Sequence, residues 1–308
     1  MHSEEESKRR YGAAASAGKV CLVLMILAFS TPSCLVKRTV VVPVSSKILA
    51  AKTATLDELL SSLATYSDKI MSLSSGTLRV SFTSGKSESG KLQAYPSAPC
   101  WIILKRPDLI RLNIQTPLTK TTLFELVASG DPFSFWDTRE NKLYLGKNSM
   151  KEIDLEGHSF TLRPKHIFEA ILPQRVDLSE PGSYLLPEED RDATTKYYVL
   201  SLLKGDGGKM MRPRRRLWID RSILAVVRQE IFDDQGRVAS NITYSKLAPV
   251  GDLLLPLSIK VERPEDGYSL DMQFKDWRIN PELGANDFVF TPPEGAQRVE
   301  LKEKGRSG

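Results

Sequence analysis

The chain has 308 residues, of which 41% are hydrophobic and 26% are charged, and its formal net charge is +5. This is ordinary globular composition, with enough length for one large or two modest domains. Basic and acidic residues are interleaved almost everywhere, so the charge gives no argument for nucleic acid as a partner. We therefore expect that the protein does not bind nucleic acid.

The first 33 residues have the pattern of an export signal. Basic residues precede an unbroken apolar run from Val20 to Phe29, which is too short to span a bilayer but fits the core of a signal peptide. Ser33 and Cys34 follow at a spacing that resembles the lipobox of bacterial lipoproteins, in which the cysteine is acylated. We therefore expect residues 1–33 to be removed and Cys34 to carry lipid. Cleavage after Ser30, or Cys34 as an ordinary leader residue, are the alternatives.

Residues 34–54 show no clear period and are expected to form a tether. Behind them, Thr55 and Glu58 have the spacing of a capping box, in which each side chain binds the backbone N–H of the other residue. Apolar residues then recur at helical spacing, at Leu56, Leu59, Leu60, Leu63, Tyr66 and Ile70. These features predict an amphipathic helix of roughly four turns, which needs a surface to lie on.

From Gly76 onward the apolar period changes to two. Apolar and polar residues alternate from Leu78 to Phe82 and again from Tyr268 to Phe274. Turn-forming residues separate the strands, as at 106–108, 138–141 and 233–236. This pattern predicts antiparallel neighbours with one apolar and one polar face. We expect a domain over residues 55–300 with about 11–12 strands, followed by a charged tail at 301–308.

The stretch between residues 150 and 195 interrupts this pattern and is expected to be a lid insertion. It contains a short helical segment from Pro164 to Leu172, followed by Pro173. The polar stretch from Ser179 to Thr195 is predicted to be a long loop or lid. The expected fold is mainly β, a single curved antiparallel sheet that forms an incomplete barrel. Both helices are expected to cover its apolar concave face, which would suit an apolar ligand.

The sequence shows no catalytic or metal-binding pattern. Its three histidines, at 2, 158 and 166, are not spaced as metal ligands, and no phosphate-binding glycine loop or nucleophile motif is present. Cys100 lies in an apolar strand and is expected to pack in the core. We therefore predict a protein that is not an enzyme and that uses no cofactor or metal.

The run from Lys209 to Arg216, "KMMRPRRR", is the strongest local charge feature. It has two interpretations: attraction to anionic lipid head groups, or a solvated loop between strands that is basic for solubility. The second is favoured because the run is short and Asp206 precedes it.

Three stretches resemble the LolA/LolB lipoprotein-carrier superfamily, and LolB-like outer-membrane lipoprotein receptors in particular. "RLNIQTPLTKTTLFEL" (111–126) resembles a strand–turn–strand segment of that family, "PKHIFEAILP" (164–173) resembles its plug helix, and "LPLSIKVERPEDGYSLDMQFKDWRIN" (255–280) resembles its closing strands. Two features depart from the LolB pattern. Thr119 and Lys120 stand where that family has a glycine-bearing turn, and the tail from Asn286 looks like LolA or its relatives.

The resemblance implies residue roles as well as a fold. Leu118, at the hairpin tip, falls on the exposed leucine that LolB-like receptors use to insert lipoproteins into the membrane. The plug helix is implied to act through Ile167, Phe168 and Ile171. The residues expected to line the lipid-binding cavity are Leu78, Val80, Phe82, Leu112, Ile114, Tyr268, Leu270, Met272 and Phe274.

The function implied by the resemblance is that of an acceptor for lipoproteins. The protein would be a monomer, anchored through Cys34 on the periplasm-facing side of the outer membrane of a diderm bacterium. It would receive the acyl chains of lipoproteins, with a periplasmic carrier protein as a possible partner, and transfer them into the bilayer. The alternatives are a soluble periplasmic LolA-like carrier, if Cys34 is not acylated, and an RseB-like periplasmic sensor of lipid or lipoprotein.

Overall fold

The computed structural model describes residues 50–85, 93–150, 153–154, 163–172 and 175–303. The chain divides into two units, residues 1–47 and 48–308, and all of the described residues belong to the second. The expected signal peptide, Cys34 and most of the expected tether lie outside the described residues.

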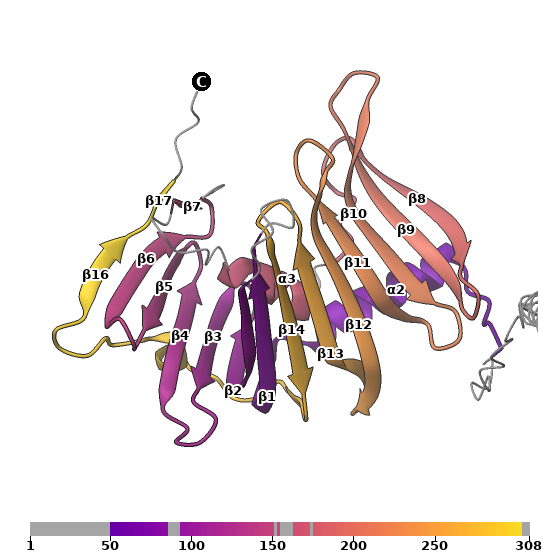
Figure 1. Cartoon of the computed structure of the whole chain (residues 1–308). Helices are drawn as coiled ribbons and strands as arrows, with labels where there is room; N and C mark the ends of the chain where they lie inside the picture. The colour runs from indigo at the N-terminus through magenta and orange to yellow at the C-terminus, as the bar shows by residue number, and fades with distance from the viewer. Residues whose placement is uncertain (1–49, 86–92, 151–152, 155–162, 173–174, 304–308) are drawn as a thin grey trace, which may run out of the picture. The chain divides into compact units, whose positions relative to one another are not determined.

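A single curved sheet carries most of this unit (Figure 1). Within the described residues, 15 strands pair in the order β16-β6-β5-β4-β3-β2-β1-β14-β13-β12-β11-β10-β9-β8, with β15 paired to β1 beside this path. The strands are β1 (Ser72–Ser84), β2 (Gln93–Lys105), β3 (Leu109–Gln115), β4 (Thr122–Ser129), β5 (Pro132–Asp137), β6 (Lys142–Lys147), β8 (Ser183–Arg191), β9 (Lys196–Gly205), β10 (Met211–Asp220), β11 (Ala225–Phe232), β12 (Val238–Val250), β13 (Leu253–Arg263), β14 (Tyr268–Phe274), β15 (Arg278–Ile279) and β16 (Gln297–Glu300). Neighbours are antiparallel, except that β16 runs parallel to β6. Two short strands, β7 (Ile153–Asp154) and β17 (Lys302–Glu303), form a separate pair.

The predicted fold class is confirmed, but the sheet has more strands than the expected 11–12. Part of the difference is β8, which lies within the stretch expected to be a loop or lid. That expectation was wrong, because residues 183–191 pair with β9 along their whole length. An edge strand tolerates Pro187 and exposed acidic side chains, so β8 lacks the apolar alternation by which interior strands are recognised.

The alternation predicted for β1 and β14 is present. The apolar residues of the two strands face one another in the pairs Leu78–Phe274, Val80–Met272 and Phe82–Leu270, and all six side chains are buried. Cys100 joins this core, as expected. Burial raises the pKa of its thiol well above the usual value, so the sulfur packs as a small hydrophobic group rather than acting as a thiolate.

One face of the sheet is apolar across many strands. A cross-strand row on this face runs through β10, β11, β12, β13 and β14, at Leu217, Gln229, Ile242, Val261 and Leu270. Helix α2 (Leu56–Lys69) packs Leu59 against Leu200 and Leu217 on the same face. Helix α3 (Pro164–Ile171) packs into the larger core, beside β4 and β13. Both helices therefore cover the apolar face.

The capping box predicted for the start of α2 is present. The backbone N–H of Glu58 donates to Oγ1 of Thr55 over 3.3 Å, and the backbone N–H of Thr55 donates to Oε2 of Glu58 over 2.7 Å. These two bonds satisfy N–H groups that would have no partner within the helix. The helix therefore begins at a defined residue.

Candidate functional site

The hairpin between β3 and β4 carries Leu118 at its tip. This side chain is 94% exposed, whereas the next most exposed large hydrophobic residues among those described reach 58%. Isolated exposed leucines are common on protein surfaces, and Leu118 is the most exposed large hydrophobic residue among those described. The hairpin was predicted from the turn residues 116–119, and its position is confirmed.

Hydrogen bonds within the tip hold Leu118 away from the core. The backbone N–H of Thr116 donates to the carbonyl of Thr121 over 2.8 Å, and the N–H of Lys120 donates to the carbonyl of Thr116 over 3.2 Å. The hydroxyl of Thr121 bonds to those of Thr116 (3.0 Å) and Thr119 (2.9 Å). Lys120 adopts a left-handed backbone conformation, with φ of 59°. The exposure of Leu118 therefore follows from a closed turn.

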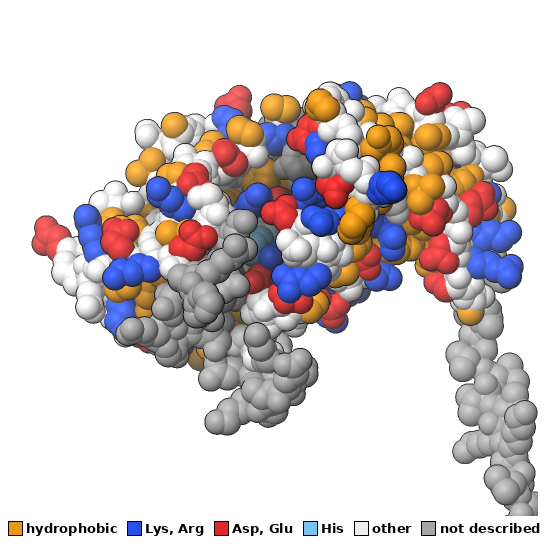
Figure 2. All heavy atoms as spheres, turned by 90° about the horizontal axis from the view of Figure 1, so that it is seen from above, with side chains coloured by type: hydrophobic (Ala, Val, Ile, Leu, Met, Phe, Trp, Pro, Cys, Tyr) orange, Lys and Arg blue, Asp and Glu red, His pale blue; other side chains and the backbone are white. Residues whose placement is uncertain are grey.

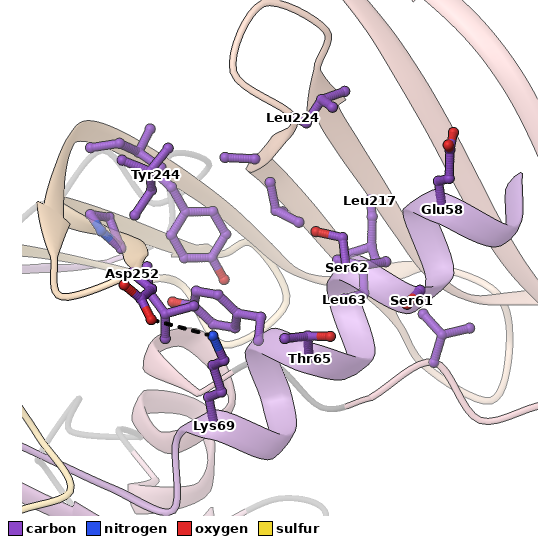
Figure 3. A pocket seen from close by; sticks show the side chains of 18 of the residues that line it. Glu58, Ser61, Ser62, Leu63, Thr65, Lys69, Leu217, Leu224, Tyr244 and Asp252 are labelled. Atoms are coloured by element: carbon purple, nitrogen blue, oxygen red, sulfur yellow. Dashed lines mark ion pairs between the residues drawn. The ribbon is translucent and has the colours of Figure 1, made fainter. Parts of the chain in front are cut away.

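A cavity of about 720 Å³ lies between α2 and strands β10–β13 (Figure 3). Its wall is predominantly apolar. The apolar residues include Leu63, Ile171, Leu217, Val226, Leu247 and Leu253. Ligand pockets in proteins range from about 300 to 1,000 Å³ and are mostly apolar with a few polar groups. The cavity therefore has the size and lining of a site for an apolar ligand.

Helix α2 is tied to the rest of the molecule at its two ends. Just before the helix, the backbone N–H of Ala54 donates to the hydroxyl of Tyr198 over 3.0 Å. At its end, the side chain of Asn280 donates to the carbonyl of Lys69 and accepts from the N–H of Met71, both over 2.8 Å. Between these two bonded ends, residues of α2 form one wall of the cavity.

The rim of the cavity carries an ion pair between helix and sheet. Nζ of Lys69, in the last turn of α2, lies 3.7 Å from a carboxylate oxygen of Asp252, in the turn between β12 and β13 (Figure 3). The two side chains are 50% and 90% exposed, and exposed pairs of this kind contribute at most about 1 kcal/mol. This pair therefore contributes little free energy to holding α2 against the sheet at the rim of the cavity.

Helix α3 fills the neighbouring part of the concave face. The predicted plug residues Ile167, Phe168 and Ile171 are all buried. Two buried hydrogen bonds fix the helix to the sheet, one from the Tyr244 hydroxyl to the Ala170 carbonyl (2.9 Å) and one between Nδ1 of His166 and the Tyr268 hydroxyl (2.8 Å). Burial and the nearby cations Arg263, Arg163 and Lys165 hold the pKa of His166 well below its usual value, so the imidazole is neutral.

The nine residues expected to line a lipid cavity lie elsewhere than the cavity found here. Eight of them are buried in the larger core, and Ile114 is half-buried against it. None of the nine lines the cavity, which Ile171 alone among the predicted site residues reaches. The physical reason is that their side chains pack in the larger core, to which the buried residues of α3 also belong. Contact of these nine residues with a ligand would require α3 to move, and it stays a prediction.

Polar residues also line the cavity: Asp57, Glu58, Ser61, Ser62, Thr65, Tyr66 and Lys69 of α2, Arg215 and Tyr244 of the sheet, and Asp252 in the turn between β12 and β13. Nε–H of Arg215 donates to Oε1 of Gln229 over 2.7 Å. Burial lowers the pKa of the Arg215 guanidinium to about 10, so it keeps its positive charge at neutral pH. Burial raises the pKa of the Tyr66 and Tyr244 hydroxyls, which therefore stay neutral. The cavity thus combines a mostly apolar wall with charged residues of both signs: Asp57, Glu58 and Asp252 are acidic, and Lys69 and Arg215 are basic.

Arg215 was not among the predicted site residues. It lies in the basic run that was expected to be a solvated loop, but most of that run belongs to β10. A register shift between Pro213 and Arg215 marks a β-bulge, after which Arg215 shares the inner face with Leu217. Arg215 is spaced by two and four residues from Leu217 and Ile219, which places all three on one face of a regular strand. This spacing is the signal that could have revealed the direction of its side chain.

Hydrophobic side chains also gather on the surface over strands β8–β10 (Figure 2). The basic run begins there, with Met210 and Met211 more than half exposed. Tyr184 of β8, which is 49% exposed, pairs with Leu203 of β9. An attraction of this run to anionic lipid stays a prediction.

Among the described residues, no group of three or more His, Cys, Asp or Glu side chains is arranged to hold a metal ion. In the same part of the chain, no helix has the length and apolar character needed to cross a bilayer.

Comparison with known proteins yields distant likenesses. No curated protein matches the sequence, and a family model described only as an uncharacterized protein matches residues 177–292. A DUF1329 family protein from Desulfovibrio piger is 15% identical, with 75% of this chain and 94% of that chain covered and a TM-score of 0.49. A putative outer membrane lipoprotein-sorting protein domain from Vibrio parahaemolyticus is 12% identical over 75% and 94% of the two chains, with a TM-score of 0.48. A LolA superfamily protein from Nitrosomonas europaea is 14% identical over 75% and 97%, with a TM-score of 0.47. At TM-scores below 0.5, these likenesses assign no function to the chain.

Proposed function

We propose that the chain binds the acyl chains of lipidated proteins in the cavity under α2 and passes them to a membrane, without catalysing a reaction. The observation that carries this proposal is the apolar cavity of about 720 Å³ beneath a helix that is tied at its ends. Removing apolar surface from water is worth about 25 cal/mol per Å². The free energy of an acyl chain therefore decreases when the chain moves from water into the cavity. The chain can leave the cavity for any site that buries more of its apolar surface.

The exposed leucine supports the membrane half of the proposal. Burying a leucine side chain is worth about 1.5–3 kcal/mol, so Leu118 can dip into the acyl region of a bilayer and bias a transfer. One such side chain does not hold a protein on a membrane. We therefore propose that acylated Cys34 supplies the anchor, on the periplasmic face of an outer membrane. A periplasmic carrier protein would deliver the ligand.

The plug helix supplies room for chains longer than the resting cavity. Ile171, at the end of α3, is part of the cavity wall, while Ile167 and Phe168 lie in the core beside it. A ligand that displaces α3 would exchange one set of apolar contacts for another, so the net cost is small. The ligand then selects a conformation in which α3 has moved, and no external energy source is required.

Cavity-filling variants test the binding half of the proposal. The purified full chain is titrated with a fluorescent palmitoylated peptide. Val226→Trp, which places a large side chain in the cavity wall, is expected to weaken binding at least about tenfold, or about 1.4 kcal/mol. Val289→Trp is the matched control, because Val289 is 58% exposed and is not part of the cavity wall. Unchanged affinity in a correctly folded Val226→Trp variant would exclude this cavity as the site.

The anchor is tested by intact mass and membrane partition of the full chain produced in a diderm host, beside Cys34→Ala. A lipid-sized mass increment and outer-membrane partition, both lost in the variant, are the expected results. An unmodified protein free in the periplasm would contradict the anchored acceptor and favour the soluble carrier. A protein that binds the palmitoylated peptide but never releases it to vesicles would favour the sensor.

A further inference from the structure

A second, smaller cavity lies beside the start of α2, at the β8 edge of the sheet. Its volume is about 220 Å³. The lining consists of Ala54, Leu56 and Leu59 from the start of the helix, and Pro187, Glu188, Glu189, Tyr198 and Leu200 from strands β8 and β9. Ligand pockets usually begin at about 300 Å³, so this cavity is too small to hold a whole ligand and suits a part of one.

The two cavities follow one another along the same face of the sheet. Leu200 lines the smaller cavity and Leu217 lines the larger one, and these two residues pair across β9 and β10. The apolar side chains of α2 show the same succession. Leu56 and Leu59 line the smaller cavity, and Leu63, one turn after Leu59, lines the larger one. One apolar stripe of α2 therefore borders both cavities.

Leu59 forms part of the boundary between the two cavities. Its side chain is buried and packs in one cluster with Leu200 and Leu217, which belong to the linings of the smaller and the larger cavity. An apolar side chain changes between staggered rotamers without breaking a hydrogen bond. A ligand can therefore pass this boundary at the cost of moving one leucine side chain.

The acidic residues of the smaller cavity have partners within the protein. Glu189 forms an ion pair with Arg221 over 2.9 Å, and a carboxylate oxygen of Glu188 accepts a 3.2 Å hydrogen bond from the Ser201 hydroxyl. The rest of the lining is mainly apolar. Such a lining suits the uncharged end of a hydrocarbon chain better than a head group.

We propose that the smaller cavity receives the end of a long acyl chain whose first part lies in the larger cavity, and that Leu59 determines which chain lengths are bound. The ligand class is then long chains, such as palmitoyl, in preference to short ones. This inference rests on the proposed binding of acyl chains under α2. It goes beyond that function because the chain extends toward β8, whereas α3 lies beside β4 and β13. Long chains therefore bind without displacement of α3.

Photocrosslinking locates the end of the chain in the unaltered protein. A palmitoylated peptide with a diazirine at the terminal carbon of its acyl chain is bound to the purified full chain and irradiated, and adducts are mapped by mass spectrometry. Adducts on residues 54–59 or 187–200 are expected. An octanoylated peptide with the same group is expected to react with the wall of the larger cavity instead, for example at Val226.

The results that overturn the inference differ in what they leave standing. Palmitoyl adducts on residues 164–171 would show that the chain displaces α3, and adducts confined to the larger cavity would show that the smaller one is not used. In both cases the proposed function survives. If neither probe gives an adduct that excess palmitoylated peptide suppresses, the proposed function fails as well.

A variant that fills the smaller cavity tests its contribution to affinity. Each methylene group that leaves water strengthens binding about fourfold. Ala54→Trp is expected to bind the octanoylated peptide like the parent and the palmitoylated peptide at least about tenfold more weakly. The matched control is Thr53→Trp, because Thr53 is exposed and lines neither cavity. Equal affinities of both variants for the palmitoylated peptide would contradict a role for the smaller cavity.

Leu59→Ala tests the boundary itself. Without the larger side chain, the palmitoylated peptide is expected to gain at least about fourfold in affinity relative to the octanoylated one. Circular dichroism checks that the variant is folded, since truncation of a buried leucine is destabilising. An unchanged ratio in the folded variant would contradict the assignment of length selection to Leu59. If the variant does not fold, the crosslinking on the unaltered protein still decides the proposal.

Discussion

The hydroxyl of Tyr244 in β12 donates a 2.9 Å hydrogen bond to the backbone carbonyl of Ala170 in α3, and both groups are buried. The same tyrosine lines the cavity under α2. Tyr244 therefore lies between α3 and the cavity. This one contact couples the plug helix to the cavity wall.

Tyr244→Phe is expected to loosen the plug helix. The Ala170 carbonyl loses its donor, and an unsatisfied buried acceptor costs about 1–3 kcal/mol. We expect the free energy of unfolding in urea to fall by about 1–2 kcal/mol and amide hydrogens of residues 164–171 to exchange faster. Tyr184→Phe, at an exposed tyrosine, serves as the control with no such effect. Equal protection of α3 in Tyr244→Phe and the parent would contradict this role.

Asn280 fixes the end of α2 and is expected to be sensitive to substitution. Its side chain bonds to the backbone at Lys69, Met71 and Ser72, and its own backbone has a left-handed φ of 52°. Asn280→Ala removes these bonds and leaves a residue that lacks the local side-chain hydrogen bonds by which Asn tolerates the left-handed conformation, which costs about 1–2 kcal/mol for residues other than Gly. The expected total loss is about 2–3 kcal/mol, measured by thermal unfolding. Asn280→Gly removes the bonds without the backbone strain, so it should lose about 1 kcal/mol less. If the two variants are equally destabilised, backbone strain plays no part.

Acid is expected to destabilise the protein partly through His166. Its folded-state pKa lies well below the usual value, so below pH about 6.5 the unfolded chain binds a proton that the folded chain does not. Stability therefore falls as pH decreases from that value, by up to about 1.4 kcal/mol per pH unit. Protonation in the folded state is opposed by Arg263, Arg163 and Lys165 and would disturb the bond to the Tyr268 hydroxyl.

His166→Gln should remove this dependence while keeping a polar group opposite Tyr268. Glu169 titrates with the opposite sign, because burial raises its folded-state pKa and its contribution is lost as pH rises. The difference between the unfolding free energies of parent and variant, followed from pH 7 downward, isolates the histidine. Parallel curves for the two proteins would show that His166 does not titrate on unfolding.

Local features of the fold were predictable because they depend on neighbours in sequence. Thr55 and Glu58 predicted a helix start, and the alternation from Leu78 to Phe82 predicted a strand with one buried face. The residues 116–119 predicted a turn, and the structure adds the threonine bonds that leave Leu118 exposed. Turn chemistry alone does not determine whether a side chain folds back, since that depends on what else is near it.

The cavity was not predictable in the same way, because its position is set by packing between distant segments. The apolar residues of β1, β3 and β14 were the natural candidates, but they pack in the larger core together with the buried residues of α3. The empty space lies instead beneath α2. Arg215 reaches it because a bulge before it shifts the register of β10. A bulge changes the face of the sheet that the following residues occupy. The composition of the segment did not reveal the presence of this bulge.

The most direct measurement of the central claim is transfer of a bound palmitoylated peptide from the full chain to lipid vesicles, comparing the parent with Leu118→Glu. Because Leu118 is 94% exposed, the substitution should change stability by less than about 0.5 kcal/mol and leave binding of the peptide intact. The matched control is Val289→Glu, at another exposed apolar residue. We expect Leu118→Glu to bind the peptide normally but to release it at least about tenfold more slowly, a barrier change of about 1.4 kcal/mol, while Val289→Glu releases it like the parent. Equal release rates for all three proteins would contradict a role for the hairpin in transfer.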